Sequence, residues 1–306
     1  MAKESNLTYI TFDGHVEVHK YRYLYFVIMF TAYILIICSN STIVCIIVIH
    51  KSLHEPMYIF IAALLLNSVL YSSAVYPKIL IDFLSKKQII SYPACLFQWL
   101  IYYCLGCSEF FLLAAMSYDR FVSICKPLQY PTIMTKTTVN MFMILAWILP
   151  ACQLSLTTLL SANKKLCSFH LNGIICNSTV QKLHCVPSRL LNIIGLIVFG
   201  SDILLPILFI LFTYTRILLI THRSGREVRK KAAQTCLPHL LVLINFSCLS
   251  AFDVLLSRLE TDISKTVRLV MFLQVVTYHP LFNPIIYGLQ MKDIYKHLKR
   301  LFGKSQ

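Results

Sequence analysis

The sequence predicts an all-α membrane protein, a bundle of seven transmembrane helices followed by a short amphipathic eighth helix. Of the 306 residues, 57% are hydrophobic and only 13% are charged. The mean hydropathy of +0.68 is far above that of a soluble globule. Long apolar runs recur along the chain, and each can cross a bilayer core, which takes roughly 20 helical residues. The polar connections between these runs are short.

The apolar runs divide the chain into three regions. Residues 1–22 are expected to form an extracellular amino terminus, residues 23–289 the seven-helix bundle, and residues 290–306 a cytoplasmic helix and tail. The predicted spans are residues 23–49, 57–80, 92–124, 139–160, 190–220, 232–256 and 267–289. No removable signal peptide is visible before the first span, so that span is expected to be the targeting signal.

The eighth helix is predicted at residues 292–302. Ile294, Leu298 and Leu301 share one of its faces, and basic residues surround them. This pattern is typical of a helix that lies in the membrane surface. The segment is too short and too basic to span.

Charge and glycosylation signals predict the orientation in the plasma membrane. Cations occur on both sides, but the densest basic group lies at the end of the fifth span and in the connector after it, and it contains Arg216, Arg223, Arg226, Arg229, Lys230 and Lys231. Glycosylation sequons begin at Asn6 and Asn177, on the opposite side. We therefore expect an extracellular amino terminus and a cytoplasmic carboxy terminus. A third sequon, at Asn40, lies within the first span, where a glycan does not fit.

The net charge of +15 does not indicate a nucleic-acid-binding protein. The cations lie between apolar spans, so membrane lipids and a cytoplasmic protein partner fit better. The histidines near the cytoplasmic ends form neither an HExxH run nor a nucleophile elbow, so we expect no enzyme and no cofactor. A secondary transporter predicts inverted repeats and broken helix pairs, which the sequence does not contain.

Two motifs lie at the cytoplasmic ends of the third and seventh spans. Within MSYDRF (residues 116–121), Asp119 can hold Arg120, either as a headgroup anchor or as a switch that frees the arginine when the helices separate. Within PLFNPIIY, which ends at Tyr287, Pro284 frees a backbone carbonyl and Asn283 can satisfy polar groups inside the bundle. A turn loosened in this way can adopt two packings.

With these motifs the chain resembles the rhodopsin-like G-protein-coupled receptors, and further stretches are similar to the olfactory receptor family. Those stretches are LHEPMY at residues 53–58, residues 116–130, KAAQTC at residues 231–236 with His239, and residues 283–289. The resemblance covers the first to the seventh span. The chain departs from the family pattern at Phe121, at Asn67 and Ser68, and at Pro238, which suggests a divergent, fish-type member.

The resemblance implies a disulfide between Cys95, at the outer start of the third span, and Cys176, and a second one between Cys167 and Cys185. All four cysteines lie in segments assigned to the oxidising side and lack the spacing of a zinc finger. The residues by themselves leave all three pairings of four cysteines open.

The resemblance also implies a ligand pocket among the outer halves of the third, fifth, sixth and seventh spans. The matching candidates are Tyr102, Tyr103, Gly106, Cys107, Asp202, Val254 and Arg258. Ordinary helix packing is the alternative for the tyrosines and small residues. Arg258 can bind a carboxylate ligand bidentately, pair with Glu260 or Asp262, or reach lipid headgroups.

Two acidic residues inside apolar spans are further candidates for function. Asp202 can hold the ammonium group of an amine ligand, but a protonated, hydrogen-bonded packing group is the favoured interpretation. Glu109 matches the family's mid-core acid, which often shares a sodium ion with an aspartate of the second span. Ser68 stands at that place, so a sodium site at Glu109 would lack the second carboxylate.

The function implied by the resemblance is that of an odorant receptor. A small odorant would favour an arrangement in which the inner end of the sixth span swings outward and exposes Arg120 and Tyr214. A heterotrimeric G protein of the olfactory stimulatory type would then bind there and raise cyclic AMP. A class A receptor for another small metabolite, or a transporter, is the alternative.

Overall fold

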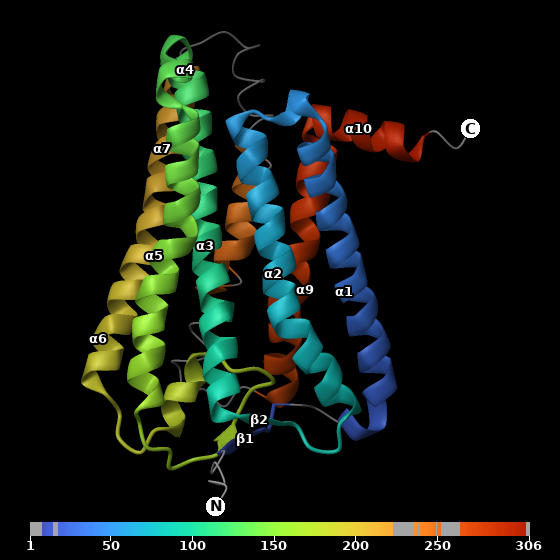
Figure 1. Cartoon of the computed structure of the whole chain (residues 1–306), viewed down its shortest axis with the longest axis vertical. Coiled ribbons are helices and arrows are strands. Elements are labelled where there is room, and N and C mark those ends of the chain that lie inside the picture. The colour runs from blue at the N-terminus through green and yellow to red at the C-terminus, as the bar shows by residue number, and fades with distance from the viewer. Residues whose placement is uncertain are drawn as a thin grey trace, which may run out of the picture.

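The computed structural model describes residues 8–14, 18–222, 236–237, 239–248, 250–251 and 264–303. Figure 1 shows its long helices side by side in one bundle. They are α1 (Val18–Ile49), α2 (Pro56–Leu84), α3 (Tyr92–Cys125), α5 (Lys136–Ala162), a fifth span of α6 (Arg189–Val198), η4 (Phe199–Leu204) and α7 (Leu205–His222), and α9 (Lys265–Gln290). The short helices are η1 (Lys51–Leu53), η2 (Pro127–Gln129), α4 (Tyr130–Ile133), η3 (Ser178–Leu183) and α10 (Lys292–Phe302).

The helices form the predicted seven-transmembrane bundle. Six of them are long and apolar enough to cross a membrane, and the described residues of the sixth span include the apolar helix His239–Cys248. Most of the long helices extend a few residues beyond the predicted spans. Polar residues at their ends lower the hydropathy but continue the backbone hydrogen bonding into the headgroup region.

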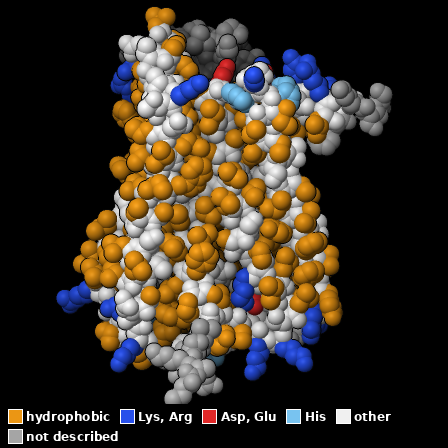
Figure 2. Space-filling view, viewed as in Figure 1, with side chains coloured by type: hydrophobic (Ala, Val, Ile, Leu, Met, Phe, Trp, Pro, Cys, Tyr) orange, Lys and Arg blue, Asp and Glu red, His pale blue; other side chains and the backbone are white. Residues whose placement is uncertain are grey.

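Burial follows the pattern of a protein whose solvent is lipid. Large apolar side chains cover the sides of the bundle (Figure 2), and Phe97, Leu159 and Leu218 are each about 65% exposed. Polar side chains such as Asn67 and Ser72 of α2 are fully buried instead. Exposed apolar side chains and buried polar ones are expected in a membrane protein, because intramembrane polar groups need partners inside the protein.

A small three-stranded sheet covers one end of the bundle, and the prediction of an all-α chain missed it. Its strands are β1 (Tyr9–Phe12), β2 (Ile89–Ser91) and β3 (His170–Leu171), in the order β2-β1-β3. β1 pairs antiparallel with β2 and parallel with β3. Strands of two to four residues are too short to give a periodic pattern. The sheet gathers the amino-terminal segment and two loops at the same end of the bundle (Figure 1).

The fifth span contains an irregularity that hydropathy cannot detect. Between α6 and α7, the residues of η4 form a π-helix, in which each turn holds an extra residue. Asp202 lies in this segment and is fully buried. The π-helical turn therefore rotates the outer part of the span relative to α7.

The opposite end of the bundle carries η2, α4 and α10 (Figure 1). The bounds of α10 are those predicted from the sequence, and Ile294 on its apolar face is fully buried. A Cβ at Gly288 of α9 would lie 3.3 Å from Ile43 of α1 and from Leu298 of α10. The absence of a side chain at Gly288 lets α10 pack close to α1 and α9.

Candidate functional site

Asp119 and Arg120 form an ion pair near the carboxy-terminal end of α3. Arg120 donates from Nε and Nη2 to Asp119 Oδ2 at 3.0 and 2.6 Å. Tyr130 of α4 donates to the other oxygen, Oδ1, at 2.7 Å. Burial and Asp119 raise the pKa of Tyr130, so the phenol stays a donor. Asp119 is fully buried, whereas the Arg120 side chain is 16% exposed, so the guanidinium is the member that a partner can reach.

Two further contacts join helices near this end. Tyr58 of α2 donates to Asp293 of α10 at 2.8 Å. Tyr214 of α7 shares a hydrogen bond with Nδ1 of His239 in the sixth span, and both side chains are buried. Sequence reasoning noted Tyr214 and His239 separately but missed both contacts. If the sixth span moves away from the fifth, the Tyr214–His239 bond has to break.

A buried polar cluster lies at mid-depth between α2, α3 and α9. Glu109 contacts His279, and both side chains are nearly fully buried. Asn283 donates from Nδ2 toward Ser68 Oγ and Glu109 Oε1, each at 3.1 Å. His279 was not considered in the sequence analysis, although it lies one helical turn before Asn283 and therefore on the same face of α9.

This cluster changes the interpretation of Glu109 as a sodium ligand. The group in contact with the Glu109 carboxylate is the imidazole of His279. Ser68 is linked to the carboxylate through Asn283, which contacts both. Among the residues that the structure describes, no group of three His, Cys, Asp or Glu side chains could hold a metal ion. The contacts described for the Glu109 carboxylate come from His279 and Asn283, and a sodium site there stays a prediction.

The carbonyl that Pro284 frees is satisfied from another helix. Proline has no N–H, so the carbonyl four residues earlier, Pro280 O, has no helical donor. Asn40 of α1 donates from Nδ2 to Pro280 O at 2.9 Å and to Ile36 O at 2.8 Å. Asn283 contacts other polar groups inside the bundle, namely Ser68 and Glu109. Asn40, the first residue of the third sequon, therefore links α1 to α9, and its side chain is fully buried.

Replacing Asn40 by alanine is expected to destabilise the bundle by about 1–3 kcal/mol, because Pro280 O would be left buried without a donor. Thermal unfolding of the purified receptor in detergent measures the change. Ser39→Ala is the matched control, since Ser39 Oγ donates only to carbonyls of its own helix. Equal melting temperatures for the two variants would contradict this role for Asn40.

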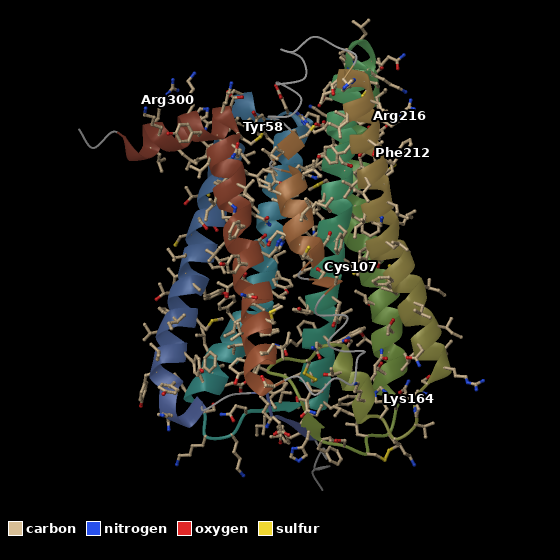
Figure 3. All side chains as sticks on the ribbon, turned by 180° about the vertical axis from the view of Figure 1, so that it is seen from behind. Tyr58, Cys107, Lys164, Phe212, Arg216 and Arg300 are labelled. Atoms are coloured by element: carbon tan, nitrogen blue, oxygen red, sulfur yellow. A yellow bond between two sulfur atoms is a disulfide. The ribbon has the colours of Figure 1, made fainter. Side chains whose placement is uncertain are left out.

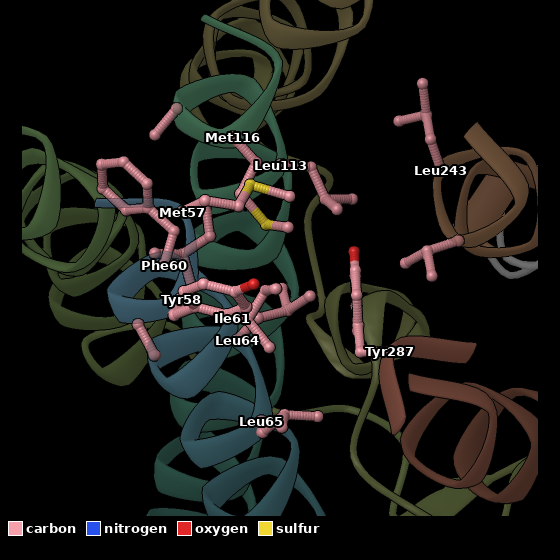
Figure 4. Close-up of a cluster of buried hydrophobic side chains, with 14 of the residues drawn as sticks. Met57, Tyr58, Phe60, Ile61, Leu64, Leu65, Leu113, Met116, Leu243 and Tyr287 are labelled. Carbon is pink, nitrogen blue, oxygen red and sulfur yellow. The ribbon is translucent and has the colours of Figure 1, made fainter. Parts of the chain in front are cut away.

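An apolar layer separates the mid-depth cluster from the Asp119–Arg120 pair. It includes Leu113 and Met116 of α3, Leu64 of α2 and Leu243 of the sixth span. Tyr287 of α9 lies between these groups of side chains (Figure 4). Its ring is fully buried, and its hydroxyl has no hydrogen-bond partner among the described residues. Tyr287 is therefore a polar group held in an apolar layer.

In the half of the bundle that carries the sheet, the described residues line two neighbouring cavities. The smaller, of about 40 Å³, is lined by Tyr102, Tyr103, Gly106 and Cys107 together with residues of α2, the fifth and sixth spans and α9. The larger, of about 430 Å³, lies between α3, α5, the fifth span and the loop after α5. Tyr103 and Cys107 line both. Figure 3 shows Cys107 inside the bundle, between the ends that carry Lys164 and Arg216.

Asp202 lines neither of these two cavities, and its described contacts are with other side chains. Ser201 donates to its Oδ1 at 2.8 Å. With its amide nitrogen turned toward the carboxylate, Gln153 of α5 donates to the same oxygen at 3.1 Å. These contacts fit the alternative of a buried, hydrogen-bonded packing group.

The loop after α5 holds the two disulfides that the resemblance implied. Cys95 at the start of α3 is bonded to Cys176, and Cys167 is bonded to Cys185. Asn177 directly follows the first bridge, and its Oδ1 accepts from Thr179 N at 3.1 Å. The bridge between Cys95 and Cys176 therefore holds the loop at the amino-terminal end of α3.

Several predicted residues lie outside the described part of the chain. They are Asn6, Val254 and Arg258, the possible Arg258 partners Glu260 and Asp262, Pro238, and the basic segment 223–231.

Comparisons with known proteins agree with the fold and its motifs. The model of a family described as "Olfactory receptor" matches residues 28–305. The chain is 30% identical to human Olfactory receptor 4S2, over 100% of this chain and 97% of that protein, and 32% identical to human Olfactory receptor 13C2, over 92% and 91%. Its fold is similar to that of squid rhodopsin, with a TM-score of 0.76 at 18% identity, covering 94% of this chain and 87% of that one.

The family match and the fold together define the class of the protein. It is a rhodopsin-like, seven-helix G-protein-coupled receptor, a multi-pass protein of the plasma membrane and not an enzyme. Within that class, the chain belongs to the olfactory receptor family.

Proposed function

We propose that this chain is an odorant receptor that binds a small molecule in the outer half of its bundle and activates a heterotrimeric G protein of the stimulatory type, raising cyclic AMP. The single observation that carries the proposal is the pair of outer cavities that share Tyr103 and Cys107. Their walls combine apolar and aromatic side chains with a few polar groups, as small-molecule sites do. Val254 and Arg258 remain proposed members of this site.

The inner end supports the coupling step. Arg120 is held by Asp119, and the fifth and sixth spans are joined by Tyr214 and His239. A ligand that favours the arrangement with a separated sixth span would weaken the second contact and open the first to a partner. The carboxy-terminal helix of a G-protein α subunit would insert there. Asn283, Pro284 and Tyr287 are the proposed hinge, and Glu109 is proposed as a structural acid paired with His279.

The proposed orientation has the amino terminus outside and the tail in the cytoplasm. Pairing of β1 with β3 keeps the amino-terminal segment at the same end as Asn177, one of the two proposed glycosylation sites. The carboxy-terminal end of α3, which carries the Asp119–Arg120 pair, and α10 lie at the other end (Figure 1). Membrane lipids would contact the basic face of α10.

The experiment that tests this function is a cyclic AMP assay in cells that express an olfactory-type stimulatory G protein, with a screen of small acids, alcohols, aldehydes and amines. Arg120→Ala is expected to abolish the response to any active compound, because the guanidinium is the exposed member of the pair. Arg216→Ala is the matched control, since this exposed arginine of α7 lies near the same end. With surface amounts equalised, a full response of the Arg120 variant would refute the coupling model.

A further inference from the structure

The larger outer cavity lies beside the pocket expected among the third, fifth, sixth and seventh spans and shares Tyr103, Cys107 and Ile203 with the smaller cavity. Among the described residues, its lining comes from α3, α5, the fifth span and the loop between α5 and α6, with none from α9 or the sixth span. Its volume of about 430 Å³ lies within the range of small-molecule sites. It can therefore hold a ligand of its own beside the smaller cavity.

One end of this cavity is polar and lies under the loop. Ser178, Gln181, Lys182 and His184 line it there. The Ser178 hydroxyl is buried and has no hydrogen-bond partner among the described residues, so it is a donor without an acceptor. Native structures rarely leave such a group unsatisfied unless a ligand or a water completes it.

The positive charge at this end comes from lysine. Burial and the nearby Lys164 lower the pKa of His184, so its imidazole is neutral at physiological pH. Its Nε2 lies 3.2 Å from the hydroxyl of Tyr92, which itself donates to Ser161 O. Lys182 is exposed, and no acidic side chain among the described residues lines the cavity.

The opposite end is apolar. Leu154 of α5, Val198 of α6 and Ile203 of η4 line it, together with Cys107 of α3. Asp202, the neighbouring acid, is turned away and satisfied by Ser201 and Gln153. The cavity thus offers a donor-rich cationic mouth and an apolar interior.

The whole surrounding end of the bundle is cationic. Figure 2 shows lysine and arginine side chains spread around the end that carries the sheet. Of the acids that the structure describes there, Asp82 is paired with Lys78 and Asp13 with His170. Extracellular surfaces carry no general requirement for excess positive charge, which is a cytoplasmic feature in most membrane proteins. The positive electrostatic potential at this end of the bundle raises the local concentration and the association rate of anions.

We propose that this cavity binds a small amphiphilic carboxylate, with its head on Ser178 and Lys182 and its chain against Leu154, Val198 and Ile203. The inference deepens the proposed function and rests on it only for signalling. Ser178 supplies a short neutral donor, and Lys182 supplies the charge that distinguishes an acid from an alcohol of the same length. A charge-assisted hydrogen bond of this kind is expected to change affinity by about tenfold.

The test compares octanoate, 1-octanol and octylamine, which share one chain and differ in the head. Binding is measured on the purified full-length receptor by ligand-induced thermal shift, and signalling by cyclic AMP in cells. We expect octanoate to bind about tenfold more tightly than 1-octanol, and octylamine to bind most weakly. Lys182→Ala should remove the advantage of octanoate over 1-octanol and leave 1-octanol binding unchanged.

Two further variants test whether the effect is specific to Lys182 and whether Ser178 takes part in binding. Lys87→Ala is the matched control, because Lys87 is an exposed lysine of the first loop at the same end and does not line the cavity. Ser178→Ala keeps the sequon at Asn177 and should weaken octanoate binding without lowering the melting temperature of the empty receptor, since the hydroxyl it removes has no partner there.

The outcomes separate the two proposals. If 1-octanol binds as well as octanoate, if the Lys87 variant loses as much as the Lys182 variant, or if no probe binds, the assignment of a carboxylate site is wrong. If octanoate binds in the expected way but neither it nor any screened odorant raises cyclic AMP, the carboxylate site stands and the proposed signalling function fails.

Discussion

Removing the Cys95–Cys176 disulfide is expected to lower the stability of the folded receptor by about 4–5 kcal/mol, because the bridge closes a long loop of the unfolded chain. The two cysteines are separated by 81 residues, whereas Cys167 and Cys185 are separated by only 18. The same chain-entropy relation gives about 3 kcal/mol for the shorter loop. The first bridge also ties α3 to the loop that forms the mouth of the larger cavity, so its loss affects both folding and the ligand site.

The measurement compares the double variants Cys95→Ser/Cys176→Ser and Cys167→Ser/Cys185→Ser, which leave no unpaired thiol from the broken bridge. Cell-surface amount and melting temperature are recorded for both. The variant without the long-range bridge should melt lower and reach the surface less. Equal losses, or a larger loss for the short-range pair, would contradict the loop-length argument.

Glu109→Ala is expected to destabilise the receptor by about 3–5 kcal/mol, since breaking a buried pair leaves the partner uncompensated. His279 would lose the carboxylate beside it, and Asn283 would lose one of the acceptors of its amide. Glu109→Gln should cost much less, because its amide oxygen, in the place of Oε1, can still accept from Asn283 and from Nε2 of His279. Thermal unfolding of the purified receptor measures all three proteins.

A double-mutant cycle with His279→Ala isolates the pair. When Glu109 is already alanine, the second substitution should cost less than it does in the wild type, because the interaction it removes is no longer present. Strictly additive losses would mean that the contact between Glu109 and His279 contributes nothing to stability. A Glu109→Ala variant as stable as Glu109→Gln would contradict the role of the carboxylate.

The two buried polar regions are connected by α9 and α3. The mid-depth cluster lies on one side of the apolar layer, and the Asp119–Arg120 pair lies on the other. Tyr287, whose hydroxyl is unpaired in that layer, belongs to the same helix as His279 and Asn283. A change in packing at the Pro284 turn would therefore affect both the cluster side chains of α9 and Tyr287 in the apolar layer.

The sequence by itself determined the spans, the short surface helix and the family. Hydropathy is a sum over neighbouring residues, so a run such as residues 57–80 identifies a span without knowledge of its partners. The bounds of α10 were exact because its amphipathic pattern is also local. The motifs MSYDRF and PLFNPIIY are recognised by the order and spacing of their residues, and the sequence alone gives both.

The tertiary structure alone decided which distant polar groups meet. Asn40 lies 240 residues from Pro280, and Asn283 lies 174 residues from Glu109. No local pattern contains such a pair, and the strands of the outer sheet are too short to have a pattern at all. The role of Asp202 was ambiguous for the same reason. The sequence does not show whether the neighbours of a buried acid are a ligand or side chains such as Ser201 and Gln153. Only the packing of the helices determines which donors reach a buried acceptor.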